Sequence, residues 1–285
     1  DNPYAGTWAS AASMNTARFR IGGAGTPSAA LAFGGLEPAT SAKTESWNGS
    51  AWSEVNDLNT ARRSLAGTGI QTSAILGGGY TTANVDNAET WNGSSWTEVA
   101  EVNTARRGGM GIGNASASLV AGGIVTGVVA VNESWNGSAW TEVGDLNTAK
   151  GNAAGAGTTT AGIIAGGAVP SETGQTEIWN GSSWTEVADL NTVRAELAGA
   201  GTSTDSLAFG GYAPPGYLAN TESWDGSSWT EVNDLATGRS TLAGSGPSGS
   251  AALAFGGANP SATGATEEWA FTGLDPSTTP AADYA

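Results

Sequence analysis

The phrase KTESWNGSAWSEVNDLNTAR, at residues 43–62, recurs with few changes along the whole chain. Its first tryptophan returns with a spacing of 44 or 45 residues, at Trp47, Trp91, Trp135, Trp179, Trp224 and Trp269. A fixed period of this length is the sequence signature of a repeat protein, in which each copy is one supersecondary unit. The fold must therefore be an array of these units.

The two ends of the chain together complete one unit. The segment Trp8–Arg18, WASAASMNTAR, aligns without a gap with Trp52–Arg62, whereas the last unit continues after Trp269 as AFTGLDPS instead of NGSSW. An open solenoid needs polar capping repeats at its ends, and no such caps are visible. We predict a closed ring in which the N-terminal strand completes the last unit. The chain begins at Asp1 without Met, and we expect it to be part of a longer protein.

Each unit contains four extended segments. In one copy they are SLAGTGI at 64–70, AILGGG at 74–79, AETW at 88–91 and SSWTEV at 94–99. Four short strands per unit of this length, repeated around a ring, are typical of the blades of a β-propeller. The sequence predicts an all-β fold, a six-bladed β-propeller of four-stranded antiparallel blades. We expect one domain at 1–272, with blades at about 18–57, 62–101, 106–145, 150–189, 194–234, and 239–272 plus 1–14, and a C-terminal tail or linker at 273–285.

The Asn-Gly pair between the two tryptophans predicts a tight hairpin. Asn-Gly is favoured in two-residue type I′ turns, where both residues have positive φ. Such a turn would place the two tryptophans on the same face of the sheet as diagonal neighbours, where they can fill the gap between blades. The Asn-Gly-Ser sequences also match the N-glycosylation acceptor, but the hairpin explains them without a glycan.

One basic residue in every unit predicts a ring of ion pairs. The basic residues are Arg18, Arg62, Arg106, Lys150, Arg194 and Arg239. Matching glutamates occur twice per unit, as Glu45, Glu89, Glu133, Glu177, Glu222 and Glu267 and as Glu54, Glu98, Glu142, Glu186 and Glu231. Because a site for one ligand rarely needs six identical copies, we interpret the pairs as structural links between blades, in which a guanidinium meets a carboxylate.

These motifs resemble the kelch repeat: paired glycines after an apolar strand, a tryptophan in the fourth strand, and a basic residue that opens the next unit. The resemblance covers residues 1 to about 272 in six copies, although Trp47 and its equivalents replace the usual tyrosine of strand three. It implies a propeller whose ligands bind on the face that carries the loops after the paired glycines. The combination of few lysines, many small polar residues and paired tryptophans is also similar to propellers encoded by marine bacteriophages and bacteria.

Composition disfavours several classes of function. With 26 acidic and 10 basic residues the net charge is −16, which opposes binding to nucleic acid. No apolar run is long enough to insert into a membrane. The chain has no His and no Cys, the residues on which acid–base and nucleophilic catalysis most often depend. We therefore expect no catalytic residues, no cofactor and no metal site, with an oxygen-ligated Ca²⁺ as the one metal chemistry left open.

The loop after each glycine pair is where the copies differ. These loops span residues 36–43, 80–87, 124–131, 168–175, 212–220 and 258–265, and three of the five tyrosines lie in them. Exposed tyrosines provide contact area at a low cost in conformational entropy, although they can equally pack on their own blade. The predicted ligand- or partner-binding residues are Tyr80, Asn84, Glu172, Tyr212, Tyr217 and Asn259.

The sequence thus predicts a non-enzymatic recognition or structural display module that binds a glycan or protein partner through its variable loops. The resemblance to phage propellers places it on a virion surface, in a tail-associated part or on a cell surface, within a larger assembly. An alternative is a secreted carbohydrate-active enzyme that uses loop carboxylates. A third, an intracellular adaptor of the eukaryotic kelch type, is disfavoured because no partner domain is visible in the chain.

Overall fold

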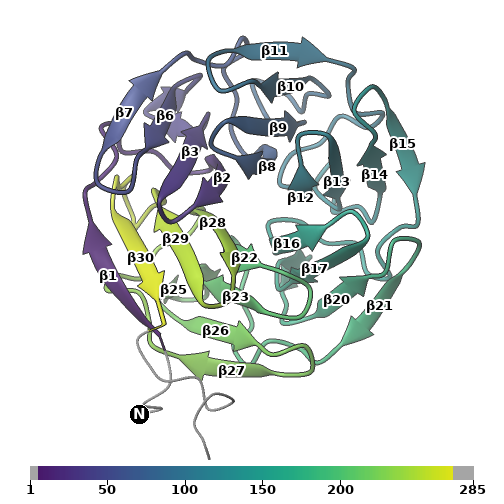
Figure 1. The fold of residues 1–285 in the computed structure, drawn as a ribbon. Coiled ribbons are helices and arrows are strands. Elements are labelled where there is room, and N and C mark those ends of the chain that lie inside the picture. Colours follow the sequence, from purple (N-terminus) through teal and green to yellow (C-terminus); the bar gives the residue numbers. More distant parts are fainter. Residues whose placement is uncertain (1–5, 272–285) are drawn as a thin grey trace, which may run out of the picture.

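The protein is a six-bladed β-propeller in a computed structural model that describes residues 6–271. Six four-stranded antiparallel sheets stand around a central channel, and the chain runs around the ring from blade to blade (Figure 1). The innermost strand of each blade faces the channel. The described residues form no helix that is long and apolar enough to cross a membrane. The predicted fold is confirmed.

Each blade runs outward from the channel, and its strands pair in chain order. Blade 1 consists of β2 (Gly22–Thr26), β3 (Ala29–Phe33), β6 (Thr44–Trp47) and β7 (Trp52–Val55). Blade 2 consists of β8 (Ala66–Ile70), β9 (Ser73–Gly77), β10 (Ala88–Trp91) and β11 (Trp96–Val99). Blade 3 consists of β12 (Met110–Asn114), β13 (Ala117–Ala121), β14 (Asn132–Trp135) and β15 (Trp140–Val143).

Blades 4 and 5 repeat this order. In blade 6 the outermost strand comes from the N-terminus of the chain. Blade 4 consists of β16 (Ala154–Thr158), β17 (Ala161–Ala165), β20 (Thr176–Trp179) and β21 (Trp184–Val187). Blade 5 consists of β22 (Ala198–Gly201), β23 (Ser206–Phe209), β26 (Thr221–Trp224) and β27 (Trp229–Val232). Blade 6 consists of β28 (Ala243–Ser248), β29 (Ala251–Phe255), β30 (Thr266–Ala270) and β1 (Thr7–Ala11).

The ring is closed by the N-terminal strand, as the sequence predicts. β1 pairs antiparallel with β30, and Trp8 lies directly opposite Trp269. The two strands come from opposite ends of the chain and lie side by side at the rim (Figure 1). The tail predicted at 273–285 lies outside the described residues.

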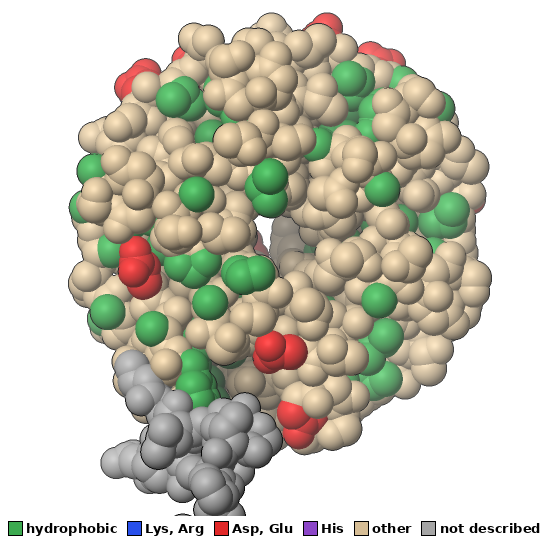
Figure 2. Space-filling model, viewed as in Figure 1, with side chains coloured by type: hydrophobic (Ala, Val, Ile, Leu, Met, Phe, Trp, Pro, Cys, Tyr) green, Lys and Arg blue, Asp and Glu red, His purple; other side chains and the backbone are tan. Residues whose placement is uncertain are grey.

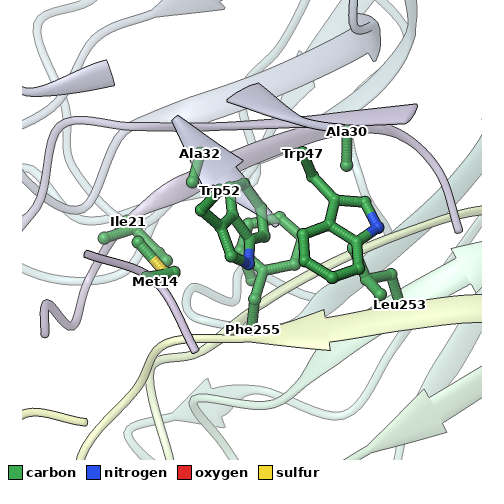
Figure 3. Close-up of a cluster of buried hydrophobic side chains, with 9 residues drawn as sticks. Met14, Ile21, Ala30, Ala32, Trp47, Trp52, Leu253 and Phe255 are labelled. Atoms are coloured by element: carbon green, nitrogen blue, oxygen red, sulfur yellow. The ribbon is translucent and has the colours of Figure 1, made fainter. Parts of the chain in front are cut away.

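The hydrophobic core lies between blades rather than within them. In one cluster the indoles of Trp47 and Trp52, from blade 1, pack against Leu253 and Phe255 of blade 6 (Figure 3). The Trp52 ring centroid is 5.0 Å from that of Phe255. Its Nε1–H donates a hydrogen bond of 2.9 Å to Oγ1 of Thr266 in the neighbouring blade. The paired tryptophans are therefore core residues that join adjacent blades.

The turn between the third and fourth strands differs from the predicted two-residue hairpin. Trp47 and Trp52 are directly opposite each other, with four residues between them, so they are not diagonal neighbours. Only Gly49 has a positive φ, of 89°. The Asn48 carboxamide instead accepts hydrogen bonds from the backbone N–H groups of Ser50 and Ala51, at 3.0 and 2.9 Å. Asn is thus selected for its side-chain oxygen, as in an Asx turn, and Gly for its backbone.

In blade 5 an aspartate takes the place of this asparagine, which gives a pH prediction. Hydrogen bonds from the Ser227 hydroxyl and from the backbone N–H groups of Ser228 and Ser227 lower the pKa of Asp225 to about 2. We expect its carboxyl group to titrate near pH 2 in an NMR pH titration of the folded protein. Because the unfolded-state pKa is higher, the turn's contribution to stability is present above about pH 4 and is lost as the pH falls towards 2. A midpoint near pH 4 would contradict the hydrogen bonds of this turn.

The paired glycines join each blade to the link that enters the next. Gly34 has a φ of 66°, and a Cβ there would lie 2.6 Å from the carbonyl oxygen of Arg62. The N–H of Gly35 donates to the same carbonyl oxygen at 2.9 Å. A side chain at Gly34 would therefore clash with the neighbouring link, which explains the recurrence of the pair in every unit.

The predicted ion pairs are present, but each joins its basic residue to a third-strand glutamate of the same unit rather than to the neighbouring blade. The pairs are Arg18–Glu45, Arg62–Glu89, Arg106–Glu133, Lys150–Glu177, Arg194–Glu222 and Arg239–Glu267. All twelve side chains are buried. Burial lowers the pKa of Arg18, and the Glu45 carboxylate opposes that shift. Each glutamate also accepts backbone hydrogen bonds from the link before its blade; Glu45, for example, accepts from Asn15 and Thr16.

Candidate functional site

One face of the ring carries a turn that is nearly the same in five of the six blades. On it lie the turns between the third and fourth strands, five of which share the sequence Asn/Asp-Gly-Ser and the same side-chain hydrogen bonds. Figure 2 shows this face, with the opening of the central channel and no visible Lys or Arg side chain. A turn that is repeated from blade to blade offers no position at which one ligand would be preferred over another, whereas the loops after the glycine pairs, on the opposite face, differ in length and sequence.

The opposite face, here called the loop face, carries the variable loops. The first residue after each glycine pair forms a bridge with the residue after the basic residue; Tyr212, for example, exchanges backbone hydrogen bonds with Ala195 at 2.8 and 3.0 Å. Three loops form small hairpins, namely β4 (Leu36–Glu37) with β5 (Ala39–Thr40), β18 (Ala168–Val169) with β19 (Ser171–Glu172), and β24 (Tyr212–Ala213) with β25 (Gly216–Tyr217). Each loop is therefore held by backbone contacts, which leaves its side chains free to vary.

A pocket of about 440 Å³ opens on this face. Its walls include Tyr212 and Tyr217 of the blade 5 hairpin and Glu172 of the blade 4 hairpin. The small residues Ala195 and Ala258 also line it, and their size leaves room beside the channel. This volume lies within the range of pockets that hold small molecules.

The two tyrosines form an aromatic wall of the pocket. They are directly opposite each other in the β24–β25 hairpin, with ring centroids 5.6 Å apart and an edge-to-face arrangement. Both are half-buried, and the exposed residues Pro214 and Pro215 lie at the tip of their hairpin. Edge-to-face aromatic pairs stabilise each other's orientation, so the rings can receive a ligand without first becoming ordered.

The structure brings together three of the six predicted binding residues: Glu172, Tyr212 and Tyr217 line the pocket. Asn259 is exposed, does not line it, and donates a hydrogen bond of 2.5 Å from its side chain to the carbonyl oxygen of Gly238. Its side-chain amide is thus already used within the protein.

Tyr80 and Asn84 lie in a different sector of the loop face. The guanidinium carbons of Arg63 and Arg107 lie 4.7 and 5.1 Å from the centroid of the Tyr80 ring. The Asn84 side chain accepts a hydrogen bond of 3.0 Å from Arg107 and donates one of 3.0 Å to the carbonyl oxygen of Ile124. These contacts join blades 2 and 3, and a role for either residue in binding stays a prediction.

The channel opening on the loop face is lined by six residues that the sequence analysis missed. Each lies two positions after a basic residue, and its backbone N–H donates to the carbonyl oxygen of the equivalent residue in the preceding blade. These six residues, here called the mouth ring, are Arg20, Ser64, Gly108, Asn152, Glu196 and Thr241. Their hydrogen bonds, of 2.7 to 2.9 Å, form a closed circle around the channel. The side chains differ in every blade.

The backbone of the mouth ring is strained. All six residues have a positive φ, between 51° for Ser64 and 62° for Gly108. This left-handed conformation costs about 1–2 kcal/mol for a residue with a side chain, and it is least favourable for a β-branched residue such as Thr241. Only glycine adopts it freely, and only one blade uses glycine here. The link between blades is almost constant up to its basic residue, and the residues that follow differ from unit to unit. This change from constant to variable sequence is the signal that could have identified the mouth ring.

The charged groups of the mouth ring adjoin the pocket. Nη2 of Arg20 lies 3.9 Å from Oε1 of Glu196, with 38% and 28% of the two side chains exposed. The Ser240 hydroxyl donates a hydrogen bond of 2.9 Å to Oε2 of Glu196. At 3.9 Å the guanidinium and the carboxylate are too far apart to be hydrogen bonded. Both groups can therefore still form hydrogen bonds with a ligand in the pocket.

No group of three or more acidic residues gathers to bind a metal ion anywhere in residues 6–271. Carboxylates near the pocket, such as Glu172 and Glu196, come from different blades. The residues that line the pocket offer aromatic contact, hydrogen bonding and two carboxylates. No protein-family model matches the chain, and a search of curated proteins returns no significant match.

Proposed function

We propose that the chain is a non-enzymatic recognition module that binds a glycan or a protein partner on its loop face. The observation that carries the proposal is the pocket of about 440 Å³, whose aromatic wall and polar lining are unique to one sector of an otherwise repeated ring. In a repeat protein the copies share what folding requires. A site built from their differences is therefore the best candidate for function.

The biological setting that we propose is a phage virion or tail, or a cell surface, where the propeller displays this face to a partner. Support comes from the resemblance of the repeat to kelch units and to phage-encoded propellers, and from a net charge of −16, which favours solubility and opposes binding to nucleic acid.

The test is the double substitution Tyr212→Ala, Tyr217→Ala. Because it removes the aromatic wall and leaves the backbone hydrogen bonds of the hairpin in place, we expect retention on an array of immobilised glycans, or on the partner once identified, to fall by at least about tenfold, the equivalent of about 1.4 kcal/mol. The melting temperature should change little. Binding measured by surface plasmon resonance and thermal unfolding followed by circular dichroism give the two readouts.

The matched control is Tyr80→Ala, which truncates a half-buried tyrosine on the same face outside the pocket. It should weaken binding less than the double substitution. If the Tyr212 and Tyr217 changes lower the melting temperature strongly and leave binding intact, the two tyrosines are packing residues and the proposed site is wrong.

A second candidate, a carbohydrate-active enzyme, is kept because Glu172 and Glu196 line the same pocket. A pair of carboxylates is what most glycoside hydrolases use. The two functions differ in the fate of a bound oligosaccharide. A recognition module retains it unchanged, whereas an enzyme releases shorter products that chromatography detects.

A further inference from the structure

Five of the six mouth-ring residues have side chains, although their positive φ angles favour glycine. Gly108 shows that glycine is compatible with the hydrogen-bonded circle, and its φ of 62° is close to those of the other five. The chain uses glycine readily, with 44 in total. A left-handed backbone with a β-branched residue such as Thr241 is strained, and strain of this kind persists mainly at functional sites. The side chains must therefore be retained for what they contact.

Four of these residues line the pocket. Arg20, Asn152, Glu196 and Thr241 line it together with Tyr212, whereas Ser64 and Gly108 do not. Arg20 offers only hydrogen-bond donors and Glu196 only acceptors, while the amide of Asn152 and the hydroxyl of Thr241 offer both. Hydrogen-bond donors and acceptors thus occupy four consecutive positions of the mouth ring beside an aromatic wall.

This inventory fits a ligand rich in hydroxyl groups, such as a sugar, better than a cationic side chain. Every sugar hydroxyl donates one hydrogen bond and accepts others, so one hydroxyl can bridge a guanidinium and a carboxylate that are 3.9 Å apart. The C–H face of a sugar ring packs on an aromatic ring such as Tyr212 or Tyr217. A lysine ammonium, in contrast, only donates and would leave the Arg20 donors without an acceptor.

Charge favours a neutral sugar over an acidic one. Within the pocket lining, Glu172 and Glu196 oppose the single cation Arg20, and the whole chain has a net charge of −16. An anionic ligand would meet like charge both in the site and in the field of the protein. A neutral ligand meets neither.

We infer that Arg20, Asn152, Glu196 and Thr241 are specificity-determining residues of a site for a neutral sugar residue at the channel mouth. The inference rests on the proposed recognition function and adds the ligand class and the residues that select it. The closed circle of backbone hydrogen bonds holds the scaffold constant, so that side chains at these four positions can differ without a change of fold.

The experiment replaces single mouth-ring residues by glycine: Arg20→Gly, Glu196→Gly and Thr241→Gly, with Ser64→Gly as the matched control. All four changes relieve the same backbone strain, and only Ser64 lies away from the pocket. We expect every variant to keep or raise the denaturation midpoint. Retention on immobilised neutral mono- and oligosaccharides should fall by at least about tenfold for the first three and stay unchanged for Ser64→Gly. The isosteric change Glu196→Gln should give the same loss if Glu196→Gly unfolds.

Three results would overturn the inference. If the glycine variants lower the denaturation midpoint and keep binding, the side chains serve stability. If the wild-type protein retains only acidic sugars or immobilised peptides, the ligand class is wrong. If Tyr212→Ala, Tyr217→Ala abolishes sugar binding but the glycine variants do not, the recognition function stands and the mouth ring does not select the ligand. If the wild-type protein binds nothing on any array, the recognition function itself is wrong.

Discussion

Deleting residues 1–11 is expected to remove the outer strand of blade 6 and convert the protein into a self-associating species. The deletion removes β1 and leaves the outer edge of β30 unpaired, and an exposed edge strand is a template for pairing with another chain. It also removes Trp8, whose ring centroid lies 4.8 Å from that of Phe209 and whose Nε1–H donates to Thr221 of blade 5. Because Trp8 is half-buried, loss of its contacts should cost less than the roughly 3–5 kcal/mol typical of a fully buried aromatic side chain.

The measurements are size-exclusion chromatography with light scattering and thermal unfolding. The truncated protein should form dimers or larger species and melt well below the intact chain. A synthetic peptide of residues 1–14 added in trans should restore the monomer and the melting temperature, and the same peptide with Trp8→Ala should restore them less. A truncated protein that remains monomeric with an unchanged melting temperature would contradict closure by β1.

The repeat alone was sufficient to predict the propeller, because a fixed period with four strands and complementary broken ends permits few architectures. The buried ion pairs were also predicted, because a basic residue that recurs in each of six units requires an acidic partner that recurs with it. Choosing between the two glutamate rings required the structure. The glutamates of the third strand, such as Glu45, face the link that carries the basic residue, whereas those of the fourth, such as Glu54, are exposed.

The Asn-Gly turn shows where the sequence prediction failed. Asn-Gly is compatible with more than one hairpin, and the choice here is made by the two residues that follow. The hydroxyl and the backbone N–H of Ser50 both donate to the Asn48 carboxamide, which favours the longer connection. Local propensity identified a turn, and side-chain hydrogen bonding determined its length.

The mouth ring could not be predicted from propensity, because a left-handed backbone at Arg20, Glu196 or Thr241 contradicts it. The conformation is imposed by closure: each N–H can reach a carbonyl oxygen of the preceding blade only when six blades surround the channel. The pocket is likewise a product of the ring, since it combines Glu172 of blade 4 with Tyr212 of blade 5 and Ala258 of blade 6. The sequence identified the variable loops but not which of them meet.

The second large effect is expected for Glu89→Gln. The Glu89 carboxylate accepts hydrogen bonds from the backbone N–H groups of Asn59 and Thr60, from the Asn59 side chain and from the Arg62 guanidinium. The substitution removes the charge opposite a fully buried arginine and introduces an NH₂ group among donors. Removing one partner of a buried ion pair costs about 3–5 kcal/mol, because the remaining charge is left uncompensated. We expect a loss of this size in the free energy of unfolding from urea denaturation.

The matched control is Arg62→Lys, because Lys150 occupies the equivalent position in blade 4 and lies 3.2 Å from Glu177. That variant keeps the cation, and we expect it to lose much less stability than Glu89→Gln. The asymmetry follows from the structure: the glutamate organises the whole link through its backbone contacts, whereas the basic residue supplies one of several donors. If both variants lose the same free energy, the guanidinium's own contacts, such as its hydrogen bond to the carbonyl oxygen of Asn87, matter as much as the glutamate's hold on the link, and the proposed asymmetry is wrong.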